Sequence, residues 1–117
     1  MIVSGRADAV KAFDLHDGER IFHVSKRVLI GPDQGARNFV MREFTLGVGG
    51  STPYHTHAWE HEVYVVAGSG TVVSADGTTP VSAGDYVFVP PRDEHQFKNS
   101  GEDPFAFLCV VPPEGEG

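Results

Sequence analysis

The sequence predicts an all-β fold, a single domain whose short strands form a closed barrel or a sandwich. Three observations favour this fold class. The 117 residues include 14 glycines and 8 prolines, so turn-forming residues are frequent. Short β-branched and apolar runs alternate with these turns, giving roughly nine candidate strands and no convincing helix. The length supports one hydrophobic core but not two, so residues 1–117 are expected to form one domain.

The first half of the chain predicts a lead-in and two strands. Residues 1–20 show little periodicity and predict either a short strand or an irregular segment that ends at the turn pair Asp17-Gly18. The runs IFHVSKRVLI (21–30) and NFVMREFTL (38–46) are rich in apolar and β-branched residues and predict strands. The loop GPDQGAR separates them.

The second half predicts a hairpin and three more strands after the histidine-rich region. TVVSADGTTPV predicts a hairpin, because Asp76-Gly77 supplies the positive φ values of a tight turn. YVFVP, HQFKN and the apolar run FAFLCVV predict the remaining strands. The ending PPEGEG is expected not to pack, which places the core at about residues 21–112 and leaves 113–117 as a flexible tail.

Charge and composition exclude several classes of function. The net charge of −7 argues against a nucleic-acid-binding surface. The sequence contains no lysine and arginine cluster and no long apolar run, so we expect no membrane partner. We see no export signal at the N-terminus, and the one cysteine, Cys109, cannot form an internal disulfide. A cytoplasmic location is expected.

The stretch GGSTPYHTHAWEHEVYVVAG (49–68) carries the strongest functional signal. His55 and His57 are two residues apart, so on an extended strand their side chains leave the same face, and His61 keeps that parity if the strand continues through Trp59. His95 follows later. Since neutral imidazole is a good ligand for transition metals, the pattern predicts a metal site. His16 and His23 lack a ligand-like neighbour and are interpreted as surface or strand-face histidines.

The histidine spacing resembles the first motif of the cupin family. Residues 49–68 read G-x5-H-x-H-x3-H-x6-G, with a histidine where most cupins have glutamate. Six residues separate His61 from Gly68 but only five separate Glu62 from it, so His61 takes the motif position. Glu60 and Glu62 have the opposite parity and are expected on the surface.

A second motif follows at residues 84–99, which read G-x5-P-x-R-x2-H-x3-N. The departure from the cupin pattern is Arg92, where the family usually has glycine. Nearly the whole chain is similar to the small single-domain four-histidine manganese cupins, through the stretches RVLIG, NFVMREFT, HTHAWEHEVYVV and FLCVVPPEG. The resemblance implies a cupin β-barrel (a double-stranded β-helix or jelly-roll), commonly a homodimer, with one divalent metal per chain bound by His55, His57, His61 and His95.

The resemblance favours manganese as the ion, while iron, nickel, copper or zinc would also suit imidazole ligands. Four neutral ligands leave a divalent ion its full charge, which attracts anionic ligands and strengthens Lewis acidity. An octahedral ion would keep two open positions, whereas zinc could be closed off by four ligands.

Five residues are candidates for the cavity or the substrate site. Arg42 shares the parity of Val40 and Leu46, so it faces inward if they do. It then either pairs with an acidic neighbour, reaches solvent or anchors a substrate. Thr52 could lie at the mouth, and Trp59 could cap the cavity or fill a dimer contact. Phe107 and Cys109 either line the cavity or pack in the core.

Three hypotheses of function follow, and each involves a small-molecule substrate or ligand. The favoured one is a metal-dependent oxidoreductase of dioxygenase type, acting on a small anionic or phenolic substrate. The second is a redox-neutral decarboxylase or isomerase that uses the ion as a Lewis acid, although no inward carboxylate is identified as its acid or base. The third is a non-catalytic module that binds a metal or small ligand. The N-terminal strand and the run FAFLCVV contain more apolar residues than a small barrel must bury. We therefore expect these two segments to pair across a dimer interface.

Overall fold

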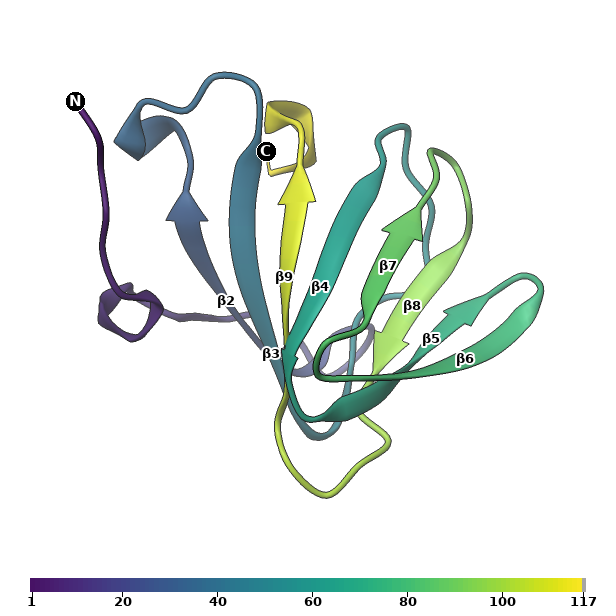
Figure 1. Cartoon of the computed structure of the whole chain (residues 1–117). Coiled ribbons are helices and arrows are strands. Elements are labelled where there is room, and N and C mark those ends of the chain that lie inside the picture. The colour runs from purple at the N-terminus through teal and green to yellow at the C-terminus, as the bar shows by residue number, and fades with distance from the viewer. Residues whose placement is uncertain (117) are drawn as a thin grey trace.

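The computed structural model describes residues 1–116 and consists of one curled β-sheet, shown in Figure 1. Its nine strands are β1 (Phe13–Asp14), β2 (Phe22–Ile30), β3 (Val40–Ser51), β4 (His61–Ala67), β5 (Ser69–Ser74), β6 (Gly77–Ser82), β7 (Tyr86–Val89), β8 (His95–Lys98) and β9 (Phe105–Val111). Three short 3-10 helices, Ala7–Ala9, Pro32–Gln34 and Pro113–Gly115, complete the described part of the chain. Within residues 1–116, no helix is long and apolar enough to cross a membrane.

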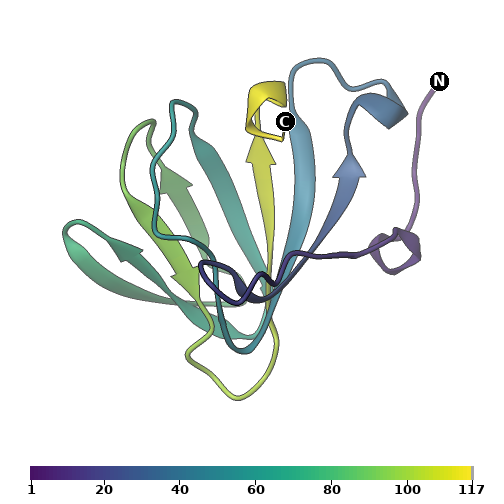
Figure 2. The same cartoon turned by 180° about the vertical axis from the view of Figure 1, so that it is seen from behind.

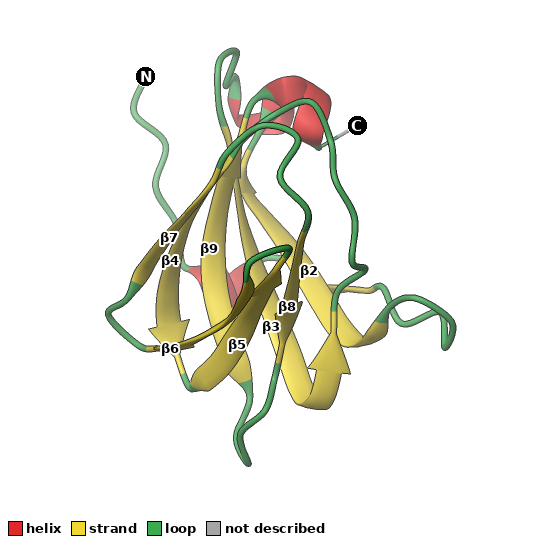
Figure 3. Ribbon diagram, turned by 90° about the vertical axis from the view of Figure 1, so that its right-hand side faces the viewer, coloured by secondary structure: helices red, strands yellow, loops and turns green. Residues whose placement is uncertain are grey.

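All strand pairs are antiparallel, and the sheet runs in the order β6-β5-β8-β3-β9-β4-β7, with β2 on β3 and β1 on β2. The sheet curls around an interior, as the side view in Figure 3 shows, and two of the short helices lie at one end of it. The predicted all-β barrel is therefore confirmed.

Strand β3 connects the parts of the barrel. Its first half, Val40–Leu46, pairs with β9 on one edge, while β2 pairs along the other. At its end, Ser51 pairs with Lys98 of β8. Gly49 lies between the two paired regions, and its φ of +76° lies in the left-handed region that glycine adopts without strain. The residues that follow run beside β8, to which Thr52 and His55 are joined by main-chain hydrogen bonds.

The core lies on the concave face and follows from strict alternation in the strands. In β9, Phe105, Phe107, Cys109 and Val111 are all buried, and β4 alternates in the same way from His61 to Val65. The Phe107 ring packs 4.7 Å from the Phe97 ring and 5.3 Å from the Phe105 ring, measured between centroids. The inner face of the barrel is therefore aromatic as well as aliphatic.

Two expectations about the chain ends need correction. The tail was expected not to pack, but Pro113–Gly115 forms a helical turn and the Glu116 carboxylate pairs with Lys26 and Arg42. Gly117 lies outside the described residues. The apolar run of β9 does not need a partner chain, because β3 and β4 pair with its two edges. The homodimer itself stays a prediction.

The N-terminal lead-in also contributes to the interior. Seen from behind in Figure 2, the purple N-terminal segment crosses the sheet near one end of β2 and β3. Leu15 and Ile21, at the end of this segment, pack against the hydrophobic core.

The approach of Gly68 to another backbone segment gives a first prediction. A Cβ at Gly68 would overlap the Pro104 carbonyl oxygen, and the residue has a φ of +74°. We expect Gly68→Ala to destabilise the fold by about 2–4 kcal/mol through backbone displacement and left-handed strain. Gly35→Ala is the matched control, because Gly35 has a φ of +91° but nothing within 4 Å of the added Cβ. Urea unfolding of the two variants measures the difference, and equal losses of stability would contradict the steric explanation.

Candidate metal centre

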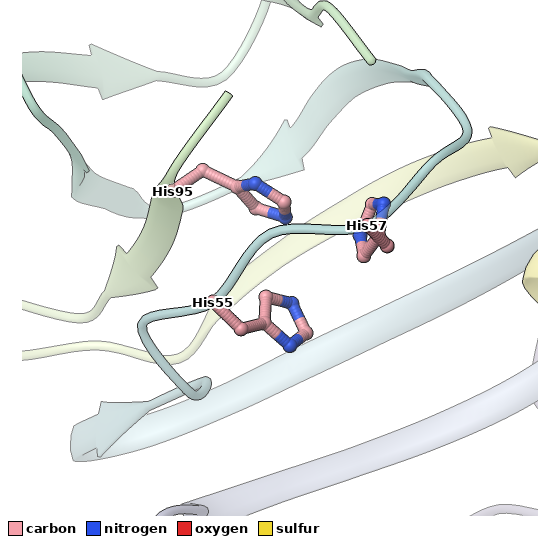
Figure 4. Close-up of side chains that lie close together, drawn as sticks. All are labelled: His55, His57 and His95. Carbon is pink, nitrogen blue, oxygen red and sulfur yellow. The ribbon is translucent and has the colours of Figure 1, made fainter. Parts of the chain in front are cut away.

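Three histidines converge on the inner face of the barrel. His55 and His57 lie on the connection between β3 and β4, and His95 begins β8. One nitrogen from each ring lies within 4.8 Å of the other two, a group that can hold a metal ion. Figure 4 shows the three imidazoles gathered from these two separate segments.

His61 joins the cluster from the first position of β4. Its Nε2 lies 2.7 Å from the Nε2 of His57, and its ring centroid lies 5.1 Å from that of His95. The group of three within 4.8 Å does not include it. His61 is buried on the same face as Val63, whereas Glu62 is exposed on the opposite face. The residue that the motif spacing selected, His61 rather than Glu62, therefore points into the barrel.

The connection that carries His55 and His57 is not a strand, contrary to the expectation of a strand continuing through Trp59. An isolated bridge at His55 joins it to β8, in which the His55 and His95 main chains exchange N–H···O bonds of 3.1 and 3.0 Å, and the Thr52 N–H donates to the Phe97 carbonyl oxygen at 3.0 Å. The two side chains still share a direction because this short segment is extended beside β8. After His57 the chain bends, so the parity with His61 results from a turn rather than from one continuous strand.

Arg92 supplies a second main-chain link to the cluster. Its N–H donates to the carbonyl oxygen of His57 at 2.8 Å, and its φ is +69°. This left-handed conformation explains why the cupin pattern prefers glycine here, since other residues adopt it with strain. Arg92 therefore adopts the same left-handed conformation that a glycine would adopt at this position of the motif.

Hydrogen bonds at Nδ1 fix the orientation of two rings. The Nδ1–H of His57 donates to the Trp59 carbonyl oxygen at 3.0 Å, and that of His95 to the Asp93 carbonyl oxygen at 2.9 Å. Carbonyl oxygens only accept, so each ring must carry its proton on Nδ1. The Nε2 lone pairs are left for a metal, which is the arrangement typical of metal-binding histidines.

His61 has a different partner, the Cys109 sulfur, 3.0 Å from its Nδ1. Without a metal, the 2.7 Å contact between the Nε2 atoms of His61 and His57 requires a proton on His61 Nε2, donated to His57. The Cys109 thiol then donates to His61 Nδ1. If His57 and His61 held a cation through their Nε2 lone pairs, the His61 proton would sit on Nδ1 and would point at the sulfur. The Cys109 thiol can either donate a hydrogen bond to His61 Nδ1 or accept one from it. The contact between His61 and Cys109 is therefore compatible with metal binding by His61.

Burial keeps these imidazoles neutral. Desolvation, followed by the neighbouring histidines, lowers the pKa of His55 from 6.5 to about 4 and that of His61 to about 3. Desolvation likewise lowers the pKa of His57, and burial raises the pKa of the Cys109 thiol. Neutral imidazole is the form that binds a metal, so the site is prepared for one.

A cavity of about 170 Å³ opens onto the four imidazoles. All five residues proposed for the cavity from the sequence line it: Arg42, Thr52, Trp59, Phe107 and Cys109. Its other walls are mostly apolar, and they include no aspartate or glutamate: Leu15, Ile21, Val24, Phe44, Pro53, Phe97 and Gly115. The cavity therefore suits a small ligand with an apolar body.

The five cavity residues predicted from the sequence differ in the contacts that they make. Thr52 uses its Oγ1 to accept the Phe97 N–H at 2.9 Å, so it holds β8 in place. Trp59 stacks on His57, with centroids 4.5 Å apart and planes at 7°. Arg42 is only 5% exposed and its Nη2 lies 3.1 Å from the Cys109 sulfur. It also pairs with Glu116, the acidic partner expected for a buried arginine, which sequence position alone did not identify.

The donor set fits a divalent transition ion. Neutral nitrogen ligands from four histidines, with two tautomers fixed by carbonyl oxygens, meet the ligand and outer-shell requirements of such a site. The ligand atoms come from elements held together by main-chain hydrogen bonds. The three-histidine group forms the nucleus of the site, with His61 in contact with it.

Known proteins resemble the chain over most of its length. Residues 42–111 match the family model of the cupin domain. The polyketide cyclase RemF from Streptomyces resistomycificus is 35% identical, with a TM-score of 0.88 over 97% of this chain and 80% of that chain. The uncharacterized protein MJ1618 of Methanocaldococcus jannaschii is 28% identical over 96% of this chain and 87% of its own length. A predicted oxalate decarboxylase from Thermotoga maritima, 21% identical with a TM-score of 0.80, shares the fold alone.

The lowered pKa values of His55 and His61 predict how the stability of the metal-free protein depends on pH. Unfolded histidines take up protons below about pH 6.5, whereas the folded rings stay neutral down to about 4 and about 3. The free energy of unfolding therefore has its full value above pH 6.5 and decreases as the pH falls toward 4, because only the unfolded histidines take up protons in that range. We expect a loss on the order of 2 kcal/mol between pH 7 and pH 5, because solvent screens part of the effect.

Urea unfolding at the two pH values, with EDTA present, measures this loss. His61→Gln removes one of the two groups and should flatten the dependence of stability on pH. An unfolding free energy that is equal at both pH values in the parent protein would show that these rings are not held neutral by the fold.

Proposed function

This chain belongs to the cupin family, and on that premise we propose that it is a metal-dependent enzyme acting on a small carbonyl or enol compound. The metal would be one divalent transition ion per chain, bound by the Nε2 atoms of His55, His57, His61 and His95. The reaction we favour is redox-neutral. When bound, the ion supplies Lewis-acid polarisation of the substrate oxygens.

The observation that carries the proposal is the contact between four imidazoles and an apolar, partly aromatic cavity. No carboxylate belongs to the ligand set or to the cavity wall within residues 1–116, so the divalent charge would stay uncompensated. Such a charge favours the enolate over the neutral ketone. The apolar walls exclude water, which strengthens this electrostatic preference.

The chain's own residues would position the substrate. Phe44 and Phe107 stack with centroids 5.6 Å apart and form one wall, and Trp59 forms another beside His57. These rings suit a flat, conjugated substrate such as the enol of a 1,3-dicarbonyl compound. The likeness to the polyketide cyclase RemF supports the same class, because polyketide chains carry repeated 1,3-dicarbonyl units.

The dioxygenase-type oxidoreductase favoured by the sequence is the second candidate. An octahedral ion with four histidine ligands has two open positions, enough for a substrate and dioxygen. Such a reaction would need no carboxylate base, and the described cavity wall contains none. Manganese as the ion, a cytoplasmic location and a homodimer stay predictions.

Binding of acetylacetone, a small 1,3-dicarbonyl compound, tests the proposal. We expect the metal-loaded protein to bind it at least about tenfold more tightly than 2-pentanone, which has one carbonyl group, with an ultraviolet change typical of the enolate. Equal affinities for the two compounds would contradict the proposal. Turnover of 1,3-dicarbonyl compounds under argon and in air then separates the two reactions, since oxygen uptake favours the dioxygenase.

Substitutions at His61 test the ligand set and its charge. His61→Ala should sharply lower the metal content measured by elemental analysis, whereas His16→Ala, at an exposed histidine outside the cluster, should retain it. His61→Glu should retain the metal but bind azide about tenfold more weakly, because the carboxylate halves the net charge of the site. Azide affinity equal to that of the parent would disprove the charge explanation.

A further inference from the structure

Two buried N–H groups in the cavity wall have no hydrogen-bond partner. They are the Nε of Arg42 and the Nε1 of Trp59, and they are the two buried side-chain polar atoms without a partner within residues 1–116. An unpaired buried donor is costly, so most are satisfied by protein, water or a ligand. Both residues line the same cavity.

The side chains of Arg42 and Trp59 both approach Gly115. The Arg42 Nη1 lies 3.5 Å from the Gly115 carbonyl oxygen, and a Cβ built on Gly115 would lie 2.8 Å from the Trp59 Nε1. Gly115 also lines the cavity. The side chains of Arg42 and Trp59 therefore belong to one region of the wall, in which the buried indole N–H packs against Gly115.

The Arg42 guanidinium is rigidly held. Its Nη1 donates to a Glu116 carboxylate oxygen at 3.1 Å, and the second oxygen of Glu116 pairs with Lys26 at 2.7 Å. Its Nη2 contacts only the Cys109 sulfur, at 3.1 Å, which is a weak acceptor. The edge of the guanidinium formed by Nε and Nη2 thus lacks an oxygen acceptor, although such an edge matches a carboxylate in bidentate geometry.

The local charge also favours an anion. Glu116 neutralises one of the two cations, Arg42 and Lys26, so the group keeps a net positive charge. Arg42 is 5% exposed, so solvent screens this charge poorly. The neighbouring Arg27 and Glu43 pair with each other at 3.3 Å and do not change the balance.

We propose that Arg42 and Trp59 form a carboxylate-binding subsite at the Gly115 end of the cavity. A ligand carboxylate accepts hydrogen bonds from the Arg42 edge and the Trp59 indole, while its apolar body lies against the phenylalanine wall. The substrate class is therefore a small, flat carboxylic acid that also carries a metal-binding oxygen. Only this link to a substrate rests on the proposed function. The subsite itself does not require a metal.

Titration of the metal-free protein with benzoate tests the subsite, because benzoate combines a flat apolar ring with one carboxylate. Benzamide, which has a similar shape and no charge, is the matched ligand. We expect benzoate to bind at least about tenfold more tightly than benzamide, as observed by calorimetry in the presence of EDTA. Equal affinities, or no benzoate binding at millimolar concentration, would overturn the proposal.

Three variants assign the binding to the proposed donors. Arg42→Lys keeps the charge but loses the planar edge, and should weaken benzoate binding at least about tenfold. Trp59→Phe keeps the aromatic ring beside His57 and removes the N–H, and should weaken it about threefold or more. Arg27→Met removes one positive charge outside the cavity and should change the affinity less than twofold.

The variants also separate this proposal from alternatives. If Arg27→Met weakens benzoate binding as much as Arg42→Lys, the affinity reflects net charge and the subsite is refuted. If Arg42→Lys fails to fold, as judged by circular dichroism, Trp59→Phe decides, and unchanged benzoate affinity in that variant refutes the subsite. Because these titrations contain no metal, a failure of the metal proposal does not alter their outcome.

Discussion

The bridge between the main chains of His55 and His95 is the interaction on which the site depends. It joins the β3–β4 connection to β8, two segments that are far apart in the sequence. Together with the main-chain bond from the Thr52 N–H to the Phe97 carbonyl oxygen, it holds the two halves of the cluster side by side. Its two hydrogen bonds also satisfy backbone groups that would otherwise be buried and unpaired beside the cavity. The bond from Arg92 to the His57 carbonyl oxygen extends the same attachment by two residues.

Alternation along the strands allowed much of the fold to be predicted. Strand β9 has the bounds of the run FAFLCVV, and the parity of His61 with Val63 correctly placed it inside. The parity argument depended on a strand continuing through Trp59, and this condition is not met, because parity does not reveal where a chain turns. Pro53 lacks an N–H for a ladder, and the chain bends after His57.

The contacts of the chain end could not be predicted from the sequence. Glu116 lies among glycines and prolines that suggest a flexible tail, and local sequence gives no sign of its partners. Its pairing with Lys26 and Arg42 depends on the folded positions of β2 and β3. The buried Arg42 was the one available signal, since an inward arginine requires an acceptor. The unpaired edge of that arginine became visible only with the acceptor in place.

One cavity wall thus combines two kinds of chemistry. At one end, burial lowers the pKa of His55, His57 and His61, and carbonyl oxygens direct the Nε2 atoms of His57 and His95 toward a common point. At the other, Arg42 and Trp59 present unpaired donors. The most direct test of the central claim is a crystal structure of the metal-loaded protein with anomalous data at the metal edge. We predict one peak per chain, with all four Nε2 atoms at about 2.0–2.2 Å. A peak without His61, or one bound by the Cys109 sulfur, would contradict the four-histidine site.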